Sequence, residues 1–421
     1  MRRSRRANFP ISAAAREFLG RHFPEHSLAD WCDWHWQLRH RFRRSADLND
    51  IFQLSSDERA ALTLLESDKP PMGITPHYAA LMDPSNPHDP LRRTHIPVPP
   101  ELETAPEEIP DPLGEQHRTV APGLVHRYPD RVLFLATGHC ATYCRYCTRS
   151  RIVGRASDEV ANTRARWDVA LDYIAAHPVI RDVLISGGDP LTLEDEPLGY
   201  LLERLGRIPH LDMVRIGTKV PMVLPMRITR ALVKQLKRFR PLWMSIHCTH
   251  PTELGPESTE ALSRLADAGV PLGSQTVLLR GVNDTPDTLK RLMHGLLKRR
   301  VRPYYLYQCD LIPGSAHFRT PVRVGLDLIG TLRGFTTGYG VPNYVVDAPD
   351  NGGKIPLLPG PPPQWDQDTL LLHNYEGRIC QYPDTAAAKD GGSLPPPSSS
   401  ASRVATSTVK PGLSPEVGEA R

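Results

Sequence analysis

Six short apolar runs recur along the chain at nearly regular intervals, and this repeat limits the fold more than any other feature. They read RVLFLAT (131–137), DVLIS (182–186), MVRIGT (213–218), LWMSIHC (242–248), PLGSQTVLL (271–279) and PYYLYQC (303–309). After a first interval of about fifty residues the spacing is about thirty, the length of one βα unit. Between the runs lie helical patterns, such as 259–268 ended by Gly269 and 288–300 with its leucine stripe. We therefore expect an α/β fold, either an open doubly wound sheet or a partial (β/α)6 TIM-like crescent barrel.

The residue types that carry chemistry gather at the ends of these runs. Three cysteines follow the first run, SGGDP follows the second, His247 ends the fourth, Gln275 lies in the fifth and Asp310 ends the sixth. In both candidate folds the carboxyl ends of the parallel strands meet at one edge of the sheet. The sequence therefore predicts a single reactive site at that edge.

The three cysteines, Cys140, Cys144 and Cys147, form a C-x3-C-x2-C motif. Three thiolates on one short loop can hold three irons of a [4Fe–4S] cluster and leave the fourth iron free to bind a reacting molecule. Structural zinc would need a fourth Cys or His at matching spacing, and His139 is badly placed to close a tetrahedron beside Cys140. The motif favours a reactive iron–sulfur centre over the alternatives of zinc or free thiols.

Composition narrows the setting of the protein. A chain of 421 residues that is 40% hydrophobic and 23% charged is ordinary for a soluble globular protein, and a formal net charge of +4 does not point to nucleic acid. The basic N-terminus has a twin arginine but no continuous apolar run after it, because Pro10 and Arg16 interrupt the segment. Seven cysteines, three of them clustered, do not resemble a disulfide framework. We expect a cytoplasmic protein with no membrane segment.

Proline-rich joints and composition divide the chain into five parts. Residues 1–93 are expected to form a helical domain, with a helix over 28–42 that buries Trp31, Trp34, Leu38 and Phe42, and a capping box from Ser55 to Glu58. Residues 94–124 form a Pro-rich connector, 125–350 the partial barrel, and 351–383 a C-terminal segment with Lys354. Residues 384–421 are poor in apolar side chains and predict a disordered tail.

Lys354 stands on a glycine-rich loop, in VVDAPDNGGK. This is not a phosphate-binding Walker A loop, because Ala348 and Ile355 occupy positions where that motif needs Gly and Ser or Thr. A lysine on such a loop can form a Schiff base with an aldehyde cofactor such as pyridoxal phosphate. A single loop lysine is ordinarily just solvated, so the motif needs support from the rest of the chain.

The cysteine motif, with Tyr146 before Cys147 and SGGDP after the second run, resembles the radical S-adenosylmethionine superfamily. That resemblance implies a crescent barrel in which the open iron chelates the methionine part of S-adenosylmethionine. An electron from the reduced cluster then generates a 5′-deoxyadenosyl radical. Cofactor binding is expected from Ser186, Gly187, Gly188 and Asp189, and, near the adenosyl group, from His247 and Gln275.

A longer match resembles the lysine 2,3-aminomutase family over residues 28 to 383. It rests on segments at 30–42, 74–93, 122–135, 144–151, 266–284, 302–311 and 341–349. The resemblance implies a pyridoxal-phosphate-dependent radical isomerase that moves the α-amino group of a basic L-amino acid to the β-carbon, with L-lysine as first choice. L-arginine or a protein-bound lysine is the alternative substrate, and a non-catalytic iron–sulfur module the alternative class.

The resemblance also implies roles for single residues. Arg127 and Arg131 would grip the cofactor phosphate, Tyr128 would lie by the pyridine ring, and Lys354 would hold the pyridoxal. Arg149 would pair with the substrate α-carboxylate. Asp310 and Asp347 would hold the distal ammonium, because two carboxylates facing one cation compensate a buried charge.

Two departures from the family pattern are visible. Only Cys380 remains where the family carries a C-terminal cysteine cluster, and Thr285 occupies the partner position, so we expect no structural zinc. The loop DAPDNGGK has a shorter glycine run, and Asp350 is a possible third acid, which keeps arginine open as a substrate. The expected partners are a small amino acid, a flavodoxin- or ferredoxin-type electron donor, and further copies of the chain in a homo-oligomer without zinc.

Overall fold

The computed structural model describes residues 9–65, 72–154, 163–349, 352–366 and 369–383. The chain divides into two compact units, Met1–Gly360 and Pro361–Arg421. The predicted tail over 384–421 and the possible third acid, Asp350, lie outside the described residues. In the described part of the chain, no helix is long and apolar enough to cross a membrane.

A single sheet organises the first unit. Its described strands include seven that run parallel and pair in chain order: β3 (Arg131–Thr137), β4 (Asp182–Gly187), β5 (Met213–Thr218), β6 (Leu242–His247), β7 (Leu272–Leu278), β8 (Val301–Gln308) and β9 (Asn343–Ala348). Each of the six predicted runs forms a strand. A doubly wound sheet reverses its strand order, so the sequential order excludes that alternative and leaves the partial barrel.

Antiparallel strands complete both edges of this sheet. β1 (Thr119–Ala121) and β2 (Leu124–Tyr128) precede β3, and β10 (Gly353–Pro356) follows β9. The six apolar runs leave out β9, which follows Pro342. β9 is nevertheless a strand because it pairs with β8 along Tyr305 to Tyr307.

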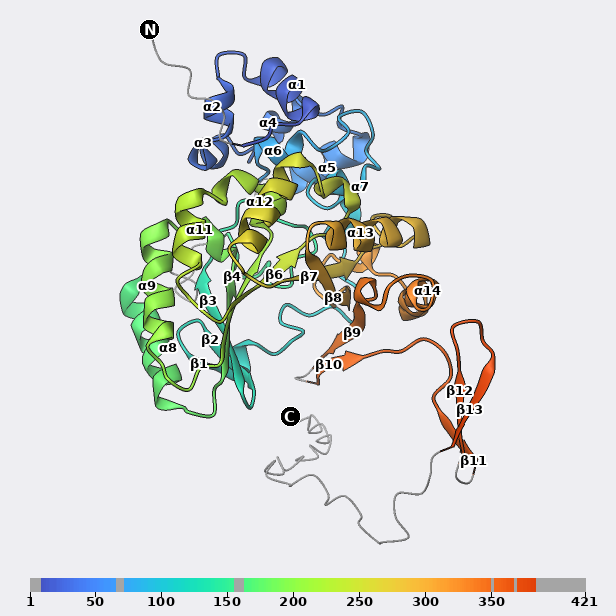
Figure 1. Cartoon of the computed structure of the whole chain (residues 1–421). Coiled ribbons are helices and arrows are strands. Elements are labelled where there is room, and N and C mark those ends of the chain that lie inside the picture. Colours follow the sequence, from blue (N-terminus) through green and yellow to red (C-terminus); the bar gives the residue numbers. More distant parts are fainter. Residues whose placement is uncertain (1–8, 66–71, 155–162, 350–351, 367–368, 384–421) are drawn as a thin grey trace, which may run out of the picture. The chain divides into compact units, whose positions relative to one another are not determined.

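Helices cover the outer face of the crescent, as Figure 1 shows for α8, α9 and α11. The crossovers contain α8 (Arg164–Ala176), α9 (Asp195–Gly206), α10 (Val220–Val223), α11 (Arg230–Leu236), α12 (Pro256–Asp267), α13 (Pro286–Lys298) and α14 (Val322–Leu332). Each buries an apolar stripe; α13 buries Leu289, Leu292, Met293 and Leu296. Gly269 ends the turn after α12 at φ +79°, as the sequence predicted.

The two faces of each strand have different surroundings. In β7 the residues Leu272, Ser274, Thr276 and Leu278 are buried, while Gly273, Gln275 and Val277 between them are only partly buried. Val277 and His247 line a cavity, so these partly buried faces point into the crescent. The apolar core therefore lies between sheet and helices, and the inner face stays open for ligands.

The N-terminal helices pack in the same compact unit as the barrel. They are α1 (Ala13–His22), α2 (Leu28–Trp31), α3 (Trp34–Arg39), α4 (Ser45–Asn49), α5 (Ser56–Leu65), α6 (Pro76–Ala79) and α7 (Pro90–Arg93). The single helix predicted over 28–42 was wrong: Asp33 accepts a hydrogen bond from the His35 amide at 2.9 Å and starts a new helix. Trp31 and Trp34 are buried as expected.

The capping box predicted at Ser55 is confirmed. The Glu58 amide donates to Ser55 Oγ at 3.2 Å, and the Ser55 amide donates to Glu58 Oε2 at 2.7 Å. Glu58 also forms a fully buried ion pair with Arg92 at 2.7 Å. The cap of α5 is thereby tied to α7.

The second unit contains a small antiparallel sheet. Its strands are β11 (Gln364–Asp366), β12 (Thr369–His373) and β13 (Ile379–Pro383). Large apolar side chains on it are exposed: Trp365, Tyr375, Ile379 and Tyr382. These side chains are more than half exposed, so the described part of this unit has apolar groups in contact with water.

Candidate active site

The cysteine loop after β3 forms one wall of a cavity of about 160 Å³ at the carboxyl ends of the strands. Cys140, Cys144 and Cys147 all line it. The cavity also contacts the ends of β4, β5 and β6, through Ser186–Asp189, Gly217–Lys219 and His247. The structure thus brings together the cysteines, the glycine turn and His247, which are far apart in sequence.

The three thiols are partly buried in the wall of the cavity. Burial raises the pKa of each, that of Cys147 to about 11, and a neighbouring thiol raises the pKa of Cys140 and Cys147 further. Thiolates in such a place need a cationic partner. Among the described residues, no three His, Cys, Asp or Glu side chains converge to hold a single metal ion. Each cysteine of a cluster site takes a different iron, so three thiols that line one cavity are a suitable ligand set for a [4Fe–4S] cluster.

A buried polar atom in the same loop also fits a ligand. Thr142 Oγ1 is buried and has no hydrogen-bond partner among the residues that the structure describes, and Thr142 lines the cavity. Buried hydroxyls are nearly always paired in native proteins. A polar molecule in this cavity would satisfy the Thr142 hydroxyl.

The glycine turn after β4 packs against the start of the cysteine loop. A Cβ atom on Gly187 would lie 2.3 Å from the Thr137 carbonyl oxygen, and one on Gly188 would lie 2.3 Å from that of His139. The amides of Gly188 and Asp189 donate to these same two carbonyls at 2.5 and 2.7 Å. The glycines are therefore required for backbone packing; their predicted contact with a cofactor stays a prediction.

The Asp189 carboxylate joins two strand ends. It accepts hydrogen bonds from Thr218 Oγ1 at 2.7 Å and from the amides of Lys219 and Leu191 at 2.7 and 3.1 Å. Burial raises the pKa of Asp189, and these donors oppose the rise. The side chain holds β4 to β5 below the cavity, so its predicted cofactor contact has few free acceptor positions left.

His247 and Gln275 are neighbours across β6 and β7. They occupy paired positions in the strand register, and their side chains are hydrogen-bonded. Burial lowers the pKa of His247 to about 4, and the charges of Lys219 and Arg149 lower it further. His247 is therefore a neutral hydrogen-bonding group in the wall of the cavity.

Sequence reasoning missed a buried ion pair beside the cysteines. Lys219 Nζ lies 2.5 Å from Glu253 Oε1, and Lys219 lines the cavity. Burial would raise the pKa of Glu253, but the Lys219 charge and amide donors lower it to about 2. Tyr78 from α6 donates to the same carboxylate at 2.9 Å. Lys219 directly follows β5, so the expectation that reactive residues lie at the carboxyl ends of the strands could have identified it.

The second group of predicted residues surrounds Lys354 on β10. Lys354 Nζ donates to Asp347 Oδ2 at 2.7 Å, and Arg127 Nη1 donates to Asp347 Oδ1 at 2.9 Å. The Asp347 and Arg127 side chains are buried, and that of Lys354 is partly exposed. Because Arg127 lies on β2 and Asp347 on β9, this ion pair joins the two ends of the crescent.

Tyr128 and Arg131 complete this group. The Lys354 amide donates to the Tyr128 hydroxyl at 3.1 Å, and the Arg131 guanidinium lies 4.2 Å from the centre of the Tyr128 ring. Arg127 Nε is buried and has no hydrogen-bond partner in the described part of the chain. A buried donor without an acceptor, beside a second arginine, fits the binding of an anion such as a phosphate.

Asp310 lies at the end of β8 and faces this group. It accepts a hydrogen bond from Thr148 Oγ1 at 2.6 Å. Burial raises the pKa of Asp310 to about 6, the Asp347 charge adds to the rise, and Lys354 and Arg149 oppose it. The negative charge of Asp347 therefore disfavours ionisation of Asp310, and the two nearby cations offset this only in part.

Arg149 forms a two-point ion pair that the sequence did not predict. Its Nε and Nη2 atoms donate to the two carboxylate oxygens of Glu115 at 3.2 and 2.8 Å. Arg149 also lines the cysteine cavity. A carboxylate does bind this guanidinium, as the prediction requires of a substrate, but the one seen here belongs to the protein.

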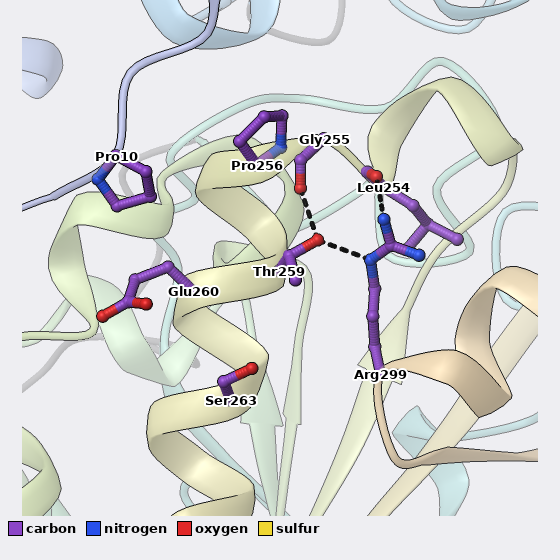
Figure 2. Close-up of a pocket in the computed structure, with 8 residues that line it drawn as sticks. All are labelled: Pro10, Leu254, Gly255, Pro256, Thr259, Glu260, Ser263 and Arg299. Carbon is purple, nitrogen blue, oxygen red and sulfur yellow. Dashed lines mark hydrogen bonds between the residues drawn. The ribbon is translucent and has the colours of Figure 1, made fainter.

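A larger hollow of about 420 Å³ lies elsewhere, on α12 and the end of α13. Figure 2 shows Arg299 at its edge, donating to Thr259 Oγ1 and to the Leu254 carbonyl. Its third nitrogen donates to Gly295, so this cation is already satisfied. The hollow shares no lining residue with the cysteine cavity. We find no group of reactive side chains among its lining residues.

The partial barrel and its cysteine loop define a radical S-adenosylmethionine protein. A family model described as the Radical SAM superfamily matches residues 134–293, which include the whole cysteine motif. Proteins of this class carry a [4Fe–4S] cluster and bind S-adenosylmethionine.

More specifically, the chain belongs to the lysine 2,3-aminomutase family and is an isomerase of the aminomutase type. A family model described as Lysine-2,3-aminomutase matches residues 329–406. The L-lysine 2,3-aminomutase of Clostridium subterminale is 48% identical over 360 residues, 86% of each chain. That of Bacillus subtilis (strain 168) is 48% identical over 84% of this chain and 74% of its own. The glutamate 2,3-aminomutase of Clostridioides difficile (strain 630) is 39% identical over 85% of this chain and 84% of its own length. Lysine 2,3-aminomutases use pyridoxal phosphate.

Proposed function

We propose that this enzyme moves the α-amino group of a basic L-amino acid to the β-carbon, and that its substrate is L-lysine. One observation supports this most. Asp347 accepts a hydrogen bond from the ammonium of Lys354 at 2.7 Å inside the crescent. The end of a lysine side chain is chemically identical to the distal group of the proposed substrate, so this carboxylate has an environment suited to that cation.

Asp310 gives the proposal its second support. With Asp347 it makes a pair of acids, and the pKa of Asp310 is raised to about 6 by burial and by the Asp347 charge. A cation between them would relieve this repulsion, whereas the distal carboxylate of glutamate would increase it. The acid pair therefore supports a basic substrate over glutamate, which the name of the Clostridioides difficile relative gives as that enzyme's substrate.

Pyridoxal phosphate is proposed to bind between Lys354 and the arginines. When bound, it supplies an aldehyde for a primary amine and a conjugated ring over which an unpaired electron can spread. Arg127, with its unpaired Nε, and Arg131 would hold the phosphate, and Tyr128 would lie beside the ring. Lys354 would hold the cofactor through its amine, and this would release Asp347 for the substrate.

The cluster and S-adenosylmethionine are proposed to occupy the cysteine cavity. When bound, they supply a carbon radical that can take a hydrogen atom from the substrate. Cys140, Cys144 and Cys147 would hold the cluster. The backbone of Ser186–Gly188 and the side chains of His247 and Gln275 would contact the adenosyl cofactor, and Arg149 would bind the substrate carboxylate.

The decisive experiment is an anaerobic assay of the enzyme reconstituted with iron, sulfide and pyridoxal phosphate, then reduced in the presence of S-adenosylmethionine. L-lysine, L-arginine and L-glutamate are supplied separately, and β-amino products are identified by mass spectrometry. We expect β-lysine as the main product. Product from glutamate alone, or from neither basic amino acid, would contradict the proposal. Asp347→Asn should abolish the preference for lysine while cluster content stays unchanged.

We also propose a flavodoxin- or ferredoxin-type electron donor and a homo-oligomer. The exposed apolar groups of the second unit, Trp365, Ile379 and Tyr382, support self-association through that sheet. Light scattering on the purified protein tests this; a monomer at micromolar concentration would contradict it. Substituting Trp365 and Tyr382 by Ser should lower the mass if the sheet forms the contact.

A further inference from the structure

The connector, residues 94–124, is fastened to the cavity region at regular intervals. Three of its glutamates, seven residues apart, each pair with an arginine near the predicted site. Glu101 pairs with Arg145 at 2.6 Å, Glu108 with Arg319 at 2.6 Å and Glu115 with Arg149 at 2.8 Å. Since Arg145 and Arg149 belong to the cysteine loop, the connector is part of the site's framework.

The third of these pairs differs from the others because its arginine lines the cavity. Glu115 is held firmly: its side chain is 5% exposed, and its amide donates to Asp111 Oδ1 at 3.0 Å. Arg151 lies farther from the same carboxylate, at 3.9 Å. Glu115 is therefore a fixed acceptor for the Arg149 guanidinium.

Glu115 engages only one edge of that guanidinium. It takes Nε and Nη2, and within the described residues Arg149 Nη1 donates no hydrogen bond. A guanidinium offers a second two-donor edge, made by Nη1 and the other hydrogen of Nη2. That edge has the geometry for a second carboxylate.

We propose that Glu115 is a positioning residue that fixes Arg149 so that its free edge receives the substrate α-carboxylate. The inference rests on the proposed function, in which Arg149 binds that carboxylate. An arginine side chain without an anchor loses considerable rotamer entropy when it binds a ligand. Glu115 removes this freedom before the substrate arrives, so its effect is on substrate binding and is exerted through Arg149.

The test measures the dissociation constant of L-lysine by calorimetry on the anaerobically reconstituted enzyme, together with KM and kcat. We expect Glu115→Gln to weaken lysine binding and raise KM roughly tenfold, the size of one lost charged hydrogen bond, while kcat changes less than about twofold. Arg149→Lys should weaken substrate binding at least as much, because the ammonium group of the new side chain lacks the two parallel N–H donors of a guanidinium. The double variant should bind no worse than Arg149→Lys alone, since Glu115 acts through Arg149.

L-lysinamide separates positioning from general damage. It lacks the carboxylate, so its affinity should be the same in the wild type and in Glu115→Gln. Glu107→Gln, on the same connector but half-exposed, is the matched control and should bind lysine normally. If Glu115→Gln does not fold or load its cluster, Glu115→Asp keeps the charge, withdraws the carboxylate by one methylene and should show the same selective loss.

The outcomes are distinguishable. Normal lysine binding by Glu115→Gln, additive losses in the double variant, or an equal loss for lysinamide would overturn the positioning role and leave the proposed function standing. Tighter lysine binding by Glu115→Gln would mean that Glu115 competes for the substrate position, which also overturns it. Unchanged binding by Arg149→Lys would overturn the carboxylate role of Arg149 and, with it, this inference.

Discussion

Lys354 and Asp347 face each other in the β9–β10 pair, and the ammonium of one lies 2.7 Å from the carboxylate of the other. The same carboxylate accepts from Arg127, which comes from the opposite end of the crescent. One buried acid is thus shared by two cations that the proposed mechanism assigns to a cofactor. Any ligand that recruits Lys354 or Arg127 changes the charge balance at Asp347.

Removal of the Lys354 amine should abolish cofactor attachment. We expect Lys354→Ala to lose the visible absorbance of bound pyridoxal and to lose activity by more than about a hundredfold, because the attachment group is gone. Borohydride reduction of the wild type should leave a pyridoxyl label on the peptide that contains Lys354. Lys290→Ala, an exposed lysine on α13, should behave as the wild type; a label on any other lysine would contradict the assignment.

Substrate affinity should depend on pH through Asp310. Its pKa is raised to about 6, so it is protonated below that pH and then cannot attract a cation. KM for lysine should therefore rise as the pH falls through 6. Asp310→Asn should remove this pH dependence: its KM should exceed that of the wild type above pH 6 and match it well below pH 6, where Asp310 is protonated. A KM profile that is unchanged in Asp310→Asn would exclude Asp310 as its source.

The same shift has a consequence for stability, with a definite sign. Because the folded pKa of Asp310 is above the unfolded value, the native state binds more protons between pH 4 and 6, and stability falls as the pH rises through that range. Asp310→Asn should consequently stabilise the cofactor-free protein by about 1–2 kcal/mol at neutral pH. The gain, measured by thermal unfolding, should vanish near pH 4; an equal gain at both pH values would point to a different cause.

Each cysteine of the motif should be required for the cluster. Replacing Cys140, Cys144 or Cys147 by Ala should remove most of the iron, sulfide and visible absorbance, since three ligands hold one cluster. Cys380→Ala should keep all three signals. Zinc analysis of the wild type should give far less than one zinc per chain, because Thr285 caps α13 instead of supplying a ligand. Full iron content in any of the three variants would remove that cysteine from the ligand set.

Two glycines should respond in opposite directions to the same substitution. Gly188→Ala would place a methyl group 2.3 Å from a backbone carbonyl and should cost roughly 3 kcal/mol or more, with loss of cluster loading. Gly330→Ala, in α14, meets nothing within 4 Å and should stabilise the protein by about 0.5–1 kcal/mol. Denaturant unfolding of both variants checks this. Unchanged stability of Gly188→Ala would mean that the backbone of the cysteine loop moves to make room for the methyl group.

Local patterns in the sequence predicted the repeating part of the fold well. Each of the six apolar runs became a strand, because a buried parallel strand must be a short continuous apolar segment. β9 was not predicted as a strand, because its strand conformation depends on pairing with β8. The helix predicted over 28–42 runs through Asp33, whose side chain caps the start of a new helix. Cap formation of this kind depends on a few atoms and leaves little trace in periodicity.

The sequence named many residues of the candidate site, but it did not predict which of them form ion pairs. Lys354 and Asp347 were each named, yet their ion pair follows from a cross-strand register that no motif encodes. Glu115 and Glu253 were not named at all, because a glutamate in a loop carries no signal until the fold places an arginine or lysine beside it. Long-range charge pairs are a property of the tertiary structure.

The ion pair between Arg127 on β2 and Asp347 on β9 gives the enzyme a means of selecting ligands by charge. In the ligand-free enzyme these two side chains bind each other, and they are the same groups that the cofactor phosphate and the substrate ammonium would recruit. A molecule that brings only a cation would take Asp347 and leave the buried Arg127 guanidinium without its carboxylate. When cofactor and substrate bind together, Arg127 gains the phosphate and Asp347 the substrate ammonium, so the enzyme favours the complete set of ligands over any part of it.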